Sequence, residues 1–286
     1  MTRTLLAAAA LLAAALPARA GDAVETALAH FQAGEYARAA EAAEKVPADD
    51  PLRARALYLA GESRLAMGEA EPAEAHFRAA LEKSPNSVPV QTGVGRCLLA
   101  RGKAAEALPV LEKAANADAK DSAARRSLGE CLAALGKKDE AKQSLEQAQK
   151  IDPKDPLSAR ALAEFHLKQK DMEAAGRAAE VHAKADPKSA MGPFLRGLAL
   201  DRLGKGKEAI EAYESAIARD PKFLDAHKNL AILCITDNPV YSNRERTKKA
   251  FEHFKKYFEL GGKDEELRQT FETIKSVLGD QGGSAK

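Results

Sequence analysis

Residues 57–85 read LYLAGESRLAMGEAEPAEAHFRAALEKSP, and copies of their pattern recur along most of the chain. The pattern has small residues at Gly61 and Ala73, an aromatic residue at Phe77 and a proline at Pro85. The position equivalent to Gly61, here called the register residue, recurs every 34 residues. A period of 34 with these small positions is typical of helix-turn-helix repeats that stack into an array. The register residues are Gly61, Gly95, Gly129, Ala163, Gly197 and Ala231.

Each recurring residue has a physical reason. A small register residue lets two antiparallel helices approach closely, and a proline after the second helix starts the next unit. Seven positions after the register residue, four repeats have a glycine, which favours the positive φ of a tight turn. Repeat 156–189 instead has Lys170 at the turn, Gly176 inside the second helix and His182 where its neighbours have alanine. We therefore expect this repeat to be the least stable one. The turn glycines are Gly68, Gly102, Gly136 and Gly204.

The recurring positions resemble those of the tetratricopeptide repeat family. The second copy matches the family at Leu57, Ala60, Gly61, Ala73, Phe77, Ala80 and Pro85. The resemblance implies an all-α fold, an α-solenoid of about seven repeats over residues 21–262 with a C-terminal capping helix. The last repeat carries an insertion, because the pattern resumes seven residues late at Ala250, and we expect a loop over 237–249. The expected repeats are 21–53, 54–87, 88–121, 122–155, 156–189, 190–223 and 224–262.

A final helix is expected after the repeats. Residues 264–278 carry one apolar stripe, acidic residues at their start favour a helix N-terminus, and Gly279 is expected to end the helix. The capping helix is therefore assigned to 263–279, and the tail 280–286 is predicted to be disordered. The stripe consists of Leu267, Phe271, Ile274 and Leu278.

A leader precedes the repeats. It has a positive start at Arg3, an apolar run over 4–16 and the small-x-small sequence of residues 18–20. This pattern predicts an export signal, residues 1–20, that is cut before Gly21. The apolar run is shorter than the ~20 residues that span a bilayer, so we expect no transmembrane segment in the mature chain. The periplasm is the expected compartment, and secretion is the alternative.

Composition points away from nucleic acids and from catalysis. The chain has 44 basic and 42 acidic residues, and removal of the leader, which holds Arg3 and Arg19 and no acid, leaves the two counts equal. Both signs are interspersed along the helices, so no basic surface for phosphates is expected. The cysteines read as small buried residues, and the histidines have no metal-binding spacing. We expect no catalytic residues, no cofactor and no metal. The cysteines are Cys97, Cys131 and Cys234.

The remaining candidate for a functional site is the exposed surface of the repeats. In proteins that resemble this family, the first helix of each repeat lines a concave groove, with exposed positions three before and one after the register residue. Two i,i+4 pairs, Arg126 with Glu130 and Arg160 with Glu164, either satisfy each other at about 0.2–0.5 kcal/mol per pair or meet a partner. The expected groove residues are Tyr58, Glu62, Thr92, Arg96, Arg126, Glu130, Arg160, Glu164, Phe194, Leu198, Lys228, Asn229 and Ile232.

The sequence predicts a binding function. The first hypothesis is a non-catalytic scaffold of the cell envelope that holds a peptide segment or a partner protein in the groove. Such a segment would place an apolar side chain on Phe194, Leu198 and Ile232 and an acidic group near Arg160 or Lys228. The alternative is an adaptor of an envelope complex that acts through its convex face or its inserted loop. A distant alternative is a subunit of a glycan-processing enzyme. The candidate loop contacts are Tyr241, Arg244 and Arg246.

Overall fold

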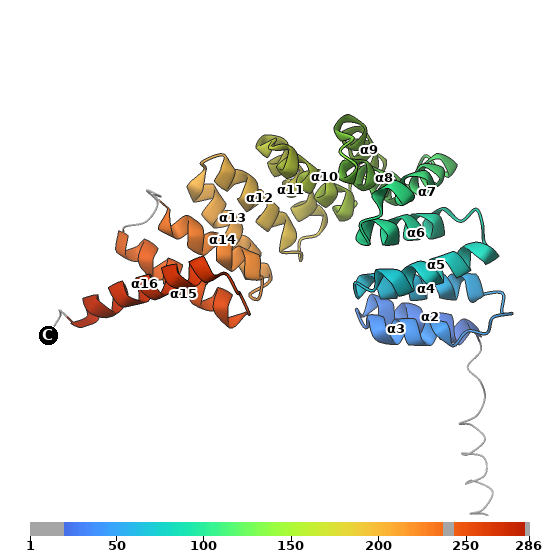
Figure 1. The fold of residues 1–286 in the computed structure, drawn as a ribbon, viewed down its shortest axis with the longest axis horizontal. Helices are drawn as coiled ribbons and strands as arrows, with labels where there is room; N and C mark the ends of the chain where they lie inside the picture. The colour runs from blue at the N-terminus through green and yellow to red at the C-terminus, as the bar shows by residue number, and fades with distance from the viewer. Residues whose placement is uncertain (1–19, 237–242, 284–286) are drawn as a thin grey trace, which may run out of the picture. The chain divides into compact units, whose positions relative to one another are not determined.

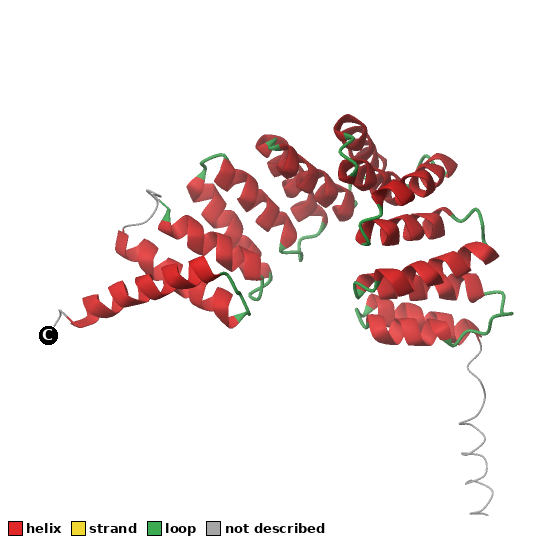
Figure 2. Cartoon of the chain, in the orientation of Figure 1, coloured by secondary structure: helices red, strands yellow, loops and turns green. Residues whose placement is uncertain are grey.

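A computed structural model describes residues 20–236 and 243–283 of the chain. These residues form helices joined by short turns and contain no strand (Figures 1 and 2). Almost all of the predicted export signal, part of the predicted inserted loop and the last three residues lie outside the described ranges. Within those ranges, no helix combines the length and the apolar character needed to cross a membrane.

The helices follow the 34-residue period in pairs. The first six pairs are α2 and α3, α4 and α5, α6 and α7, α8 and α9, α10 and α11, and α12 and α13; α14 and α15 form the seventh, and α16 stands alone. From α2 to α8, and again from α10 to α16, each helix packs against the next one along the chain, as a helical repeat array requires. The all-α class is confirmed. The bounds are α2 Ala20–Gln32, α3 Tyr36–Glu44, α4 Arg53–Ala66, α5 Ala70–Lys83, α6 Val88–Ala100, α7 Ala104–Ala117, α8 Ser122–Ala134, α9 Lys138–Ile151, α10 Pro156–Gln169, α11 Met172–Ala185, α12 Met191–Arg202, α13 Gly206–Arg219, α14 Leu224–Ile235, α15 Asn243–Glu259 and α16 Glu265–Gly283.

The register glycines lie directly under the large residue of the second helix. A Cβ atom on Gly61 would come within 2.8 Å of the Phe77 ring, and a Cβ on Gly95 would come within 2.4 Å of Leu111. Phe77 and Leu111 are fully buried, so their side chains have little room to retreat. The small register residue is therefore a packing requirement within each of these helix pairs.

The turns have the backbone that glycine favours. The four predicted turn glycines and Gly34 have φ between 72° and 79°. Lys170, which replaces the glycine in repeat 156–189, adopts the same left-handed conformation, with φ 62°. Among the described residues it is the one non-glycine with a positive φ. A side chain with a Cβ atom is disfavoured in this conformation, so the turn after α10 is strained.

The chain divides into two compact units, residues 1–144 and 145–286, and the division falls within α9. The first unit contains a core cluster formed by α2, α3 and α4, in which Val24, Val46 and Leu59 pack among alanines. The second unit has a cluster around Tyr213, Leu230 and Phe254, and a smaller one that includes Leu195. Alanine fills many of the buried positions, which lets the helices pack closely.

The insertion in the last repeat lengthens a helix, so the predicted loop over 237–249 is wrong in its second half. Residues 243–249 form the first two turns of α15. Seven residues amount to about two turns of 3.6 residues, so this addition leaves the apolar face of the helix in phase. Ala250 and Phe254 are accordingly fully buried, where the resumed pattern places them.

The last helix packs against α15. Ile274 is buried, Leu267, Phe271 and Leu278 contact the same cluster, and the Phe271 ring stacks on Phe251 with centroids 5.2 Å apart. The helix continues to Gly283, so the predicted end at Gly279 is wrong, and so is the tail boundary at residue 280. One glycine inside a helix costs only about 1 kcal/mol and does not end it alone.

Candidate peptide-binding surface

In the first unit, groove positions of neighbouring repeats pair across the repeat boundary. Arg96 donates from Nη1 to Glu62 Oε1 at 2.8 Å, although the residues are 34 positions apart. Burial lowers the pKa of Arg96, but the Glu62 carboxylate beside it outweighs that effect and the net shift is upward. Burial raises the pKa of Tyr58, whose ring lies 5.8 Å from that of Phe77, to about 12. The sequence analysis missed the pairing of Glu62 with Arg96, although opposite charges at equivalent positions were a visible signal.

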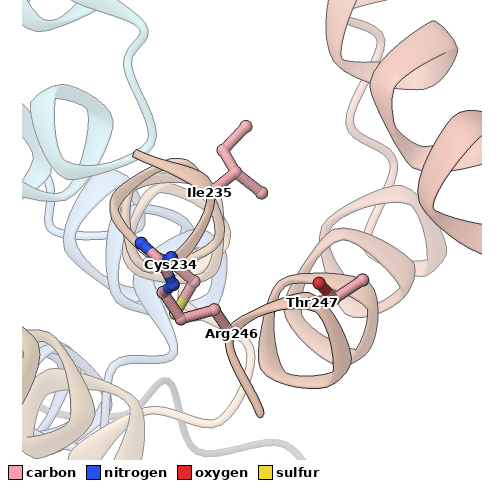
Figure 3. A pocket seen from close by; sticks show the side chains of 4 residues that line it. All are labelled: Cys234, Ile235, Arg246 and Thr247. Atoms are coloured by element: carbon pink, nitrogen blue, oxygen red, sulfur yellow. The ribbon is translucent and has the colours of Figure 1, made fainter. Parts of the chain in front are cut away.

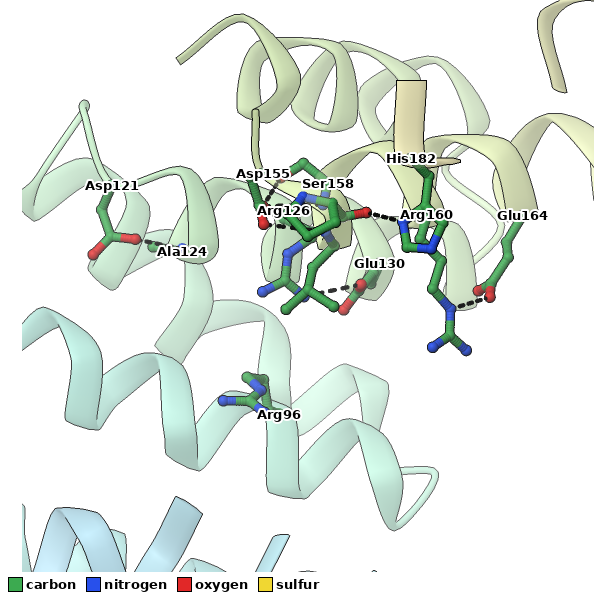
Figure 4. Close-up of polar contacts among 12 residues, drawn as sticks. Arg96, Asp121, Ala124, Arg126, Glu130, Asp155, Ser158, Arg160, Glu164 and His182 are labelled. Atoms are coloured by element: carbon green, nitrogen blue, oxygen red, sulfur yellow. Dashed lines mark hydrogen bonds and ion pairs between the residues drawn. The ribbon is translucent and has the colours of Figure 1, made fainter. Parts of the chain in front are cut away.

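One expected groove position of the first unit is not exposed. Thr92 is buried, with 4% of its surface accessible, because α6 packs against α4, α5, α7 and α8. Further along the unit, Arg126 Nη1 lies 3.4 Å from Glu130 Oε1, as the i,i+4 spacing predicts (Figure 4). The helix that carries this pair begins at an Asp121 cap, whose carboxylate accepts a hydrogen bond from the Ala124 amide.

The second unit contains a cleft between α10 and α12, here called the α10–α12 cleft. Its volume is about 380 Å³. Leucines form its apolar part, and the cations at the ends of the two helices surround it. Its acidic member, Glu164, accepts a hydrogen bond from Arg160 Nε at 2.7 Å (Figure 4). The lining residues are Glu164, Leu167, Lys168, Lys170, Leu195, Leu198 and Arg202.

Two of the expected groove residues, Glu164 and Leu198, therefore meet in one cleft. The sequence analysis missed the other lining residues because it considered only two positions per helix. Lys168 and Arg202 lie five positions after their register residues, one helical turn beyond Glu164 and Leu198. Positions four apart share a helix face, so this turn belonged to the same surface.

Phe194 is not a groove residue. It is 8% exposed, and its ring lies 4.7 Å from that of Phe223 and 6.0 Å from that of Tyr213. Three aromatic side chains that pack together remove much apolar area from water, and this favours the interior over the groove. The predicted anchor at Phe194 is therefore wrong, and Leu198 is the apolar residue of α12 that lines the cleft together with Leu195.

Three other predicted groove residues, Lys228, Asn229 and Ile232, form contacts inside the second unit. Lys228 Nζ lies 3.3 Å from Asp264 Oδ2 and 6.0 Å from the centre of the Tyr257 ring. Asn229 Nδ2 donates to the Asp225 carbonyl at 2.7 Å, and Ile232 is partly buried in the core cluster. These three residues do not line the α10–α12 cleft.

Two histidines, the buried His227 and the half-buried His253, lie between α14 and α15. Their Nδ1 atoms are 3.0 Å apart, and His227 Nε2 is 3.1 Å from the Pro221 carbonyl. The carbonyl requires a proton on His227 Nε2, so in the neutral pair His253 Nδ1 donates to His227 Nδ1. Burial, and then the neighbouring His227, lower the pKa of His253 to about 4.

The three candidate contacts of the predicted inserted loop have three different environments. Tyr241 lies outside the described residues, and Arg244 is exposed on the first turn of α15. Arg246 donates from Nη1 to the Thr236 carbonyl at 3.2 Å. It also lines a small pocket of about 250 Å³ with Cys234, Ile235 and Thr247 (Figure 3).

Within the described part of the chain, neither the thiols nor a cluster of metal-ligating residues offers a candidate for chemistry. All three cysteines are buried and unbridged. Burial raises the pKa of Cys97 to about 12 and that of Cys234 to about 11, which keeps both thiols protonated and unreactive. Over residues 20–236 and 243–283, no group of three or more metal-ligating side chains is arranged to hold an ion.

Stacked helix pairs and a cleft between neighbouring first helices define a helical-repeat interaction scaffold. Two tetratricopeptide repeat models match the sequence, one over residues 24–88, 139–190 and 194–238 and the other over 98–162. The chain therefore belongs to the tetratricopeptide repeat family. Proteins of this family are generally non-catalytic scaffolds that bind protein or peptide partners.

Solved structures share the fold. MamA from Desulfovibrio magneticus RS-1 is 26% identical, with a TM-score of 0.51 over 60% of this chain and 94% of that one. PilW, a type IV pilus biogenesis factor, is 21% identical, with a TM-score of 0.61 over 74% and 98%. YrrB, a protein of the same family with an unusual peptide-binding site, is 18% identical, with a TM-score of 0.51 over 68% and 96%. No curated protein matches the sequence.

Proposed function

We propose that this protein is a peptide-binding scaffold of the cell envelope whose partner docks in the α10–α12 cleft. The observation that carries the proposal is the cleft itself, in which the partly exposed Leu167 and Leu198 offer an apolar surface to a side chain and the buried Leu195 lies behind them. An opening of about 380 Å³ is of the size that accepts small apolar groups. The peptide-binding site of YrrB supports a peptide partner by analogy.

The envelope location rests on the sequence of the leader. A positive start, an apolar run over 4–16 and small residues before Gly21 together form an export signal. We place the mature protein in the periplasm, with secretion as the alternative. The similarity to a pilus biogenesis factor is compatible with this location and shows the fold alone.

Affinity capture from an envelope extract tests the docking surface with a matched pair of variants. Leu198→Asp puts a charge into the cleft, whereas Leu157→Asp makes the same change at a side chain that is 50% exposed on α10. We expect the first variant to lose the captured partner and the second to retain it. Leu198 also packs against the core of its unit, so circular dichroism and thermal melting of both variants are needed to test whether the fold is intact.

The adaptor hypothesis makes the opposite prediction. If the partner binds the region of the insertion, Arg244→Glu on α15 should abolish capture while Leu198→Asp has no effect. That result would overturn the cleft proposal. Arg244 suits this test because it is exposed on the first turn of α15.

A further inference from the structure

The turn after α10 combines a strained backbone with a charged side chain. Five other turns in the array place glycine at this point, with φ between 72° and 79°. Lys170 takes φ 62° there, and its amide still donates to the His166 and Leu167 carbonyls. Glycine would form the same turn without strain. Because residues held in disfavoured conformations cluster at functional sites, this outlier suggests that the lysine side chain has a role.

The Lys170 side chain lines the α10–α12 cleft, where two further cations join it. Lys168 comes from the last turn of α10, and Arg202 is the last residue of α12. All three are exposed, and none forms an ion pair with any residue that the structure describes. The Asp201 carboxylate interacts electrostatically with Arg202 but does not line the cleft. Three cations around one opening produce a positive potential that attracts anions.

The acidic residue of the cleft does not cancel this charge. Glu164 is engaged by Arg160 at 2.7 Å, and this pair is neutral as a unit. The net charge of the cleft lining is therefore positive and comes from Lys168, Lys170 and Arg202. The apolar part of the lining is formed by Leu167 and Leu198. A complementary partner has an apolar side chain flanked by carboxylates.

We propose that the α10–α12 cleft selects acidic peptide segments that carry an aliphatic side chain, and that Lys170 occupies its strained turn as a recognition residue for a partner carboxylate. This inference rests on the proposed peptide-binding function and specifies the chemistry of the partner. Partner carboxylates meet Lys170 and Arg202 at the rim, and the aliphatic side chain contacts Leu198.

Selection from a random dodecapeptide library displayed on phage tests the proposal with the full mature chain. We expect the enriched peptides to contain two or more Asp or Glu residues beside a Leu, Ile, Val or Met. The affinity of a synthetic copy of such a peptide should fall severalfold between 0.05 M and 0.5 M NaCl, because rim charges are screened. Lys170→Gly should weaken this binding about twofold to fivefold and raise the melting temperature by about 2–4 °C.

Lys205→Gly is the matched control. It makes the same substitution at the following repeat's turn, where φ is −87° and glycine relieves no strain, and Lys205 does not line the cleft. We expect it to leave the affinity unchanged and the melting temperature no higher. Increased stability of Lys170→Gly with undiminished affinity would show that the lysine merely ends the helix, and would overturn the proposal.

Two further outcomes separate this inference from the proposed function. Enriched peptides that lose binding on Leu198→Asp but show no acidic preference would refute the acidic selectivity and leave the peptide-binding function standing. If the wild-type chain enriches no peptide at all, both proposals fail.

Discussion

Replacing Gly176 with alanine should stabilise the protein, although this glycine lies in the middle of a packed helix. Gly176 is within α11, where glycine costs about 0.8–1.0 kcal/mol relative to alanine. A Cβ atom built there would meet one neighbour, the Ala199 Cβ, at 3.8 Å, which is ordinary van der Waals contact. That contact adds only ~0.1–0.2 kcal/mol, so the expected gain is about 1 kcal/mol.

The same substitution at Gly95 should have the opposite sign. A Cβ atom there would lie 2.4 Å from Leu111 Cγ and Cδ2, and the Leu111 side chain is fully buried. Overpacking costs about 1–3 kcal/mol, which exceeds or offsets the gain in helix propensity. We therefore expect Gly95→Ala to be neutral or to destabilise the fold by up to about 2 kcal/mol.

Calorimetry and amide exchange measure both effects. Gly176→Ala should raise the melting temperature of its unit by about 2–4 °C and slow exchange across α11 about fivefold. In the wild type, α11 should exchange faster than α13, because it contains the glycine and follows the strained Lys170 turn. Destabilisation by Gly176→Ala, or equal stabilisation by both substitutions, would show that the contacts around these glycines are not those described above.

Three further predictions concern other parts of the chain. N-terminal sequencing of protein from the envelope fraction should begin at Gly21, and an uncut chain in the cytoplasm would refute the export signal. Ala141→Phe should cost about 1–3 kcal/mol because Ala141 is fully buried, whereas the same change at exposed Lys138 should leave the melting temperature unaltered. Stability should decline as the pH falls from about 6.5 to about 4, because in this window the unfolded chain binds a proton that half-buried His253 resists in the folded state, with a loss of at most roughly 3 kcal/mol. His253→Gln should flatten that part of the pH profile, and an unchanged slope would contradict the assignment.

The spacing of small residues predicted the fold because each of these residues has one local physical cause. A turn with positive φ is the reason for glycine at position 68, and the Phe77 ring is the reason for a small residue at position 61. Both causes act within one repeat, so a period in the sequence is sufficient to find them. The end of α16 was harder to predict, because Gly279 inside a helix imposes a cost without imposing an end.

The site was less predictable because it depends on contacts between repeats. Phe194 occupies a position that faces the groove in a generic repeat, but Phe223 from the following turn covers it. Lys168 and Arg202 were within reach of sequence reasoning, since they extend the groove face by one helical turn. The repeat pattern could not predict which cations form ion pairs. Lys228, for example, pairs with Asp264, which lies after the last repeat in the sequence.

The pairing of Glu62 with Arg96 constrains how this gene can recombine. Both residues stand one position after the register residue, and the equivalent position of the next repeat carries Glu130. An in-frame deletion of repeat 88–121 preserves the period and the helices, yet it would bring Glu62 and Glu130 into adjacent repeats, where like charges repel. Duplication of repeat 54–87 would likewise bring two copies of Glu62 together. Repeats of equal length can be deleted or duplicated in frame, and this charge pattern makes their order matter.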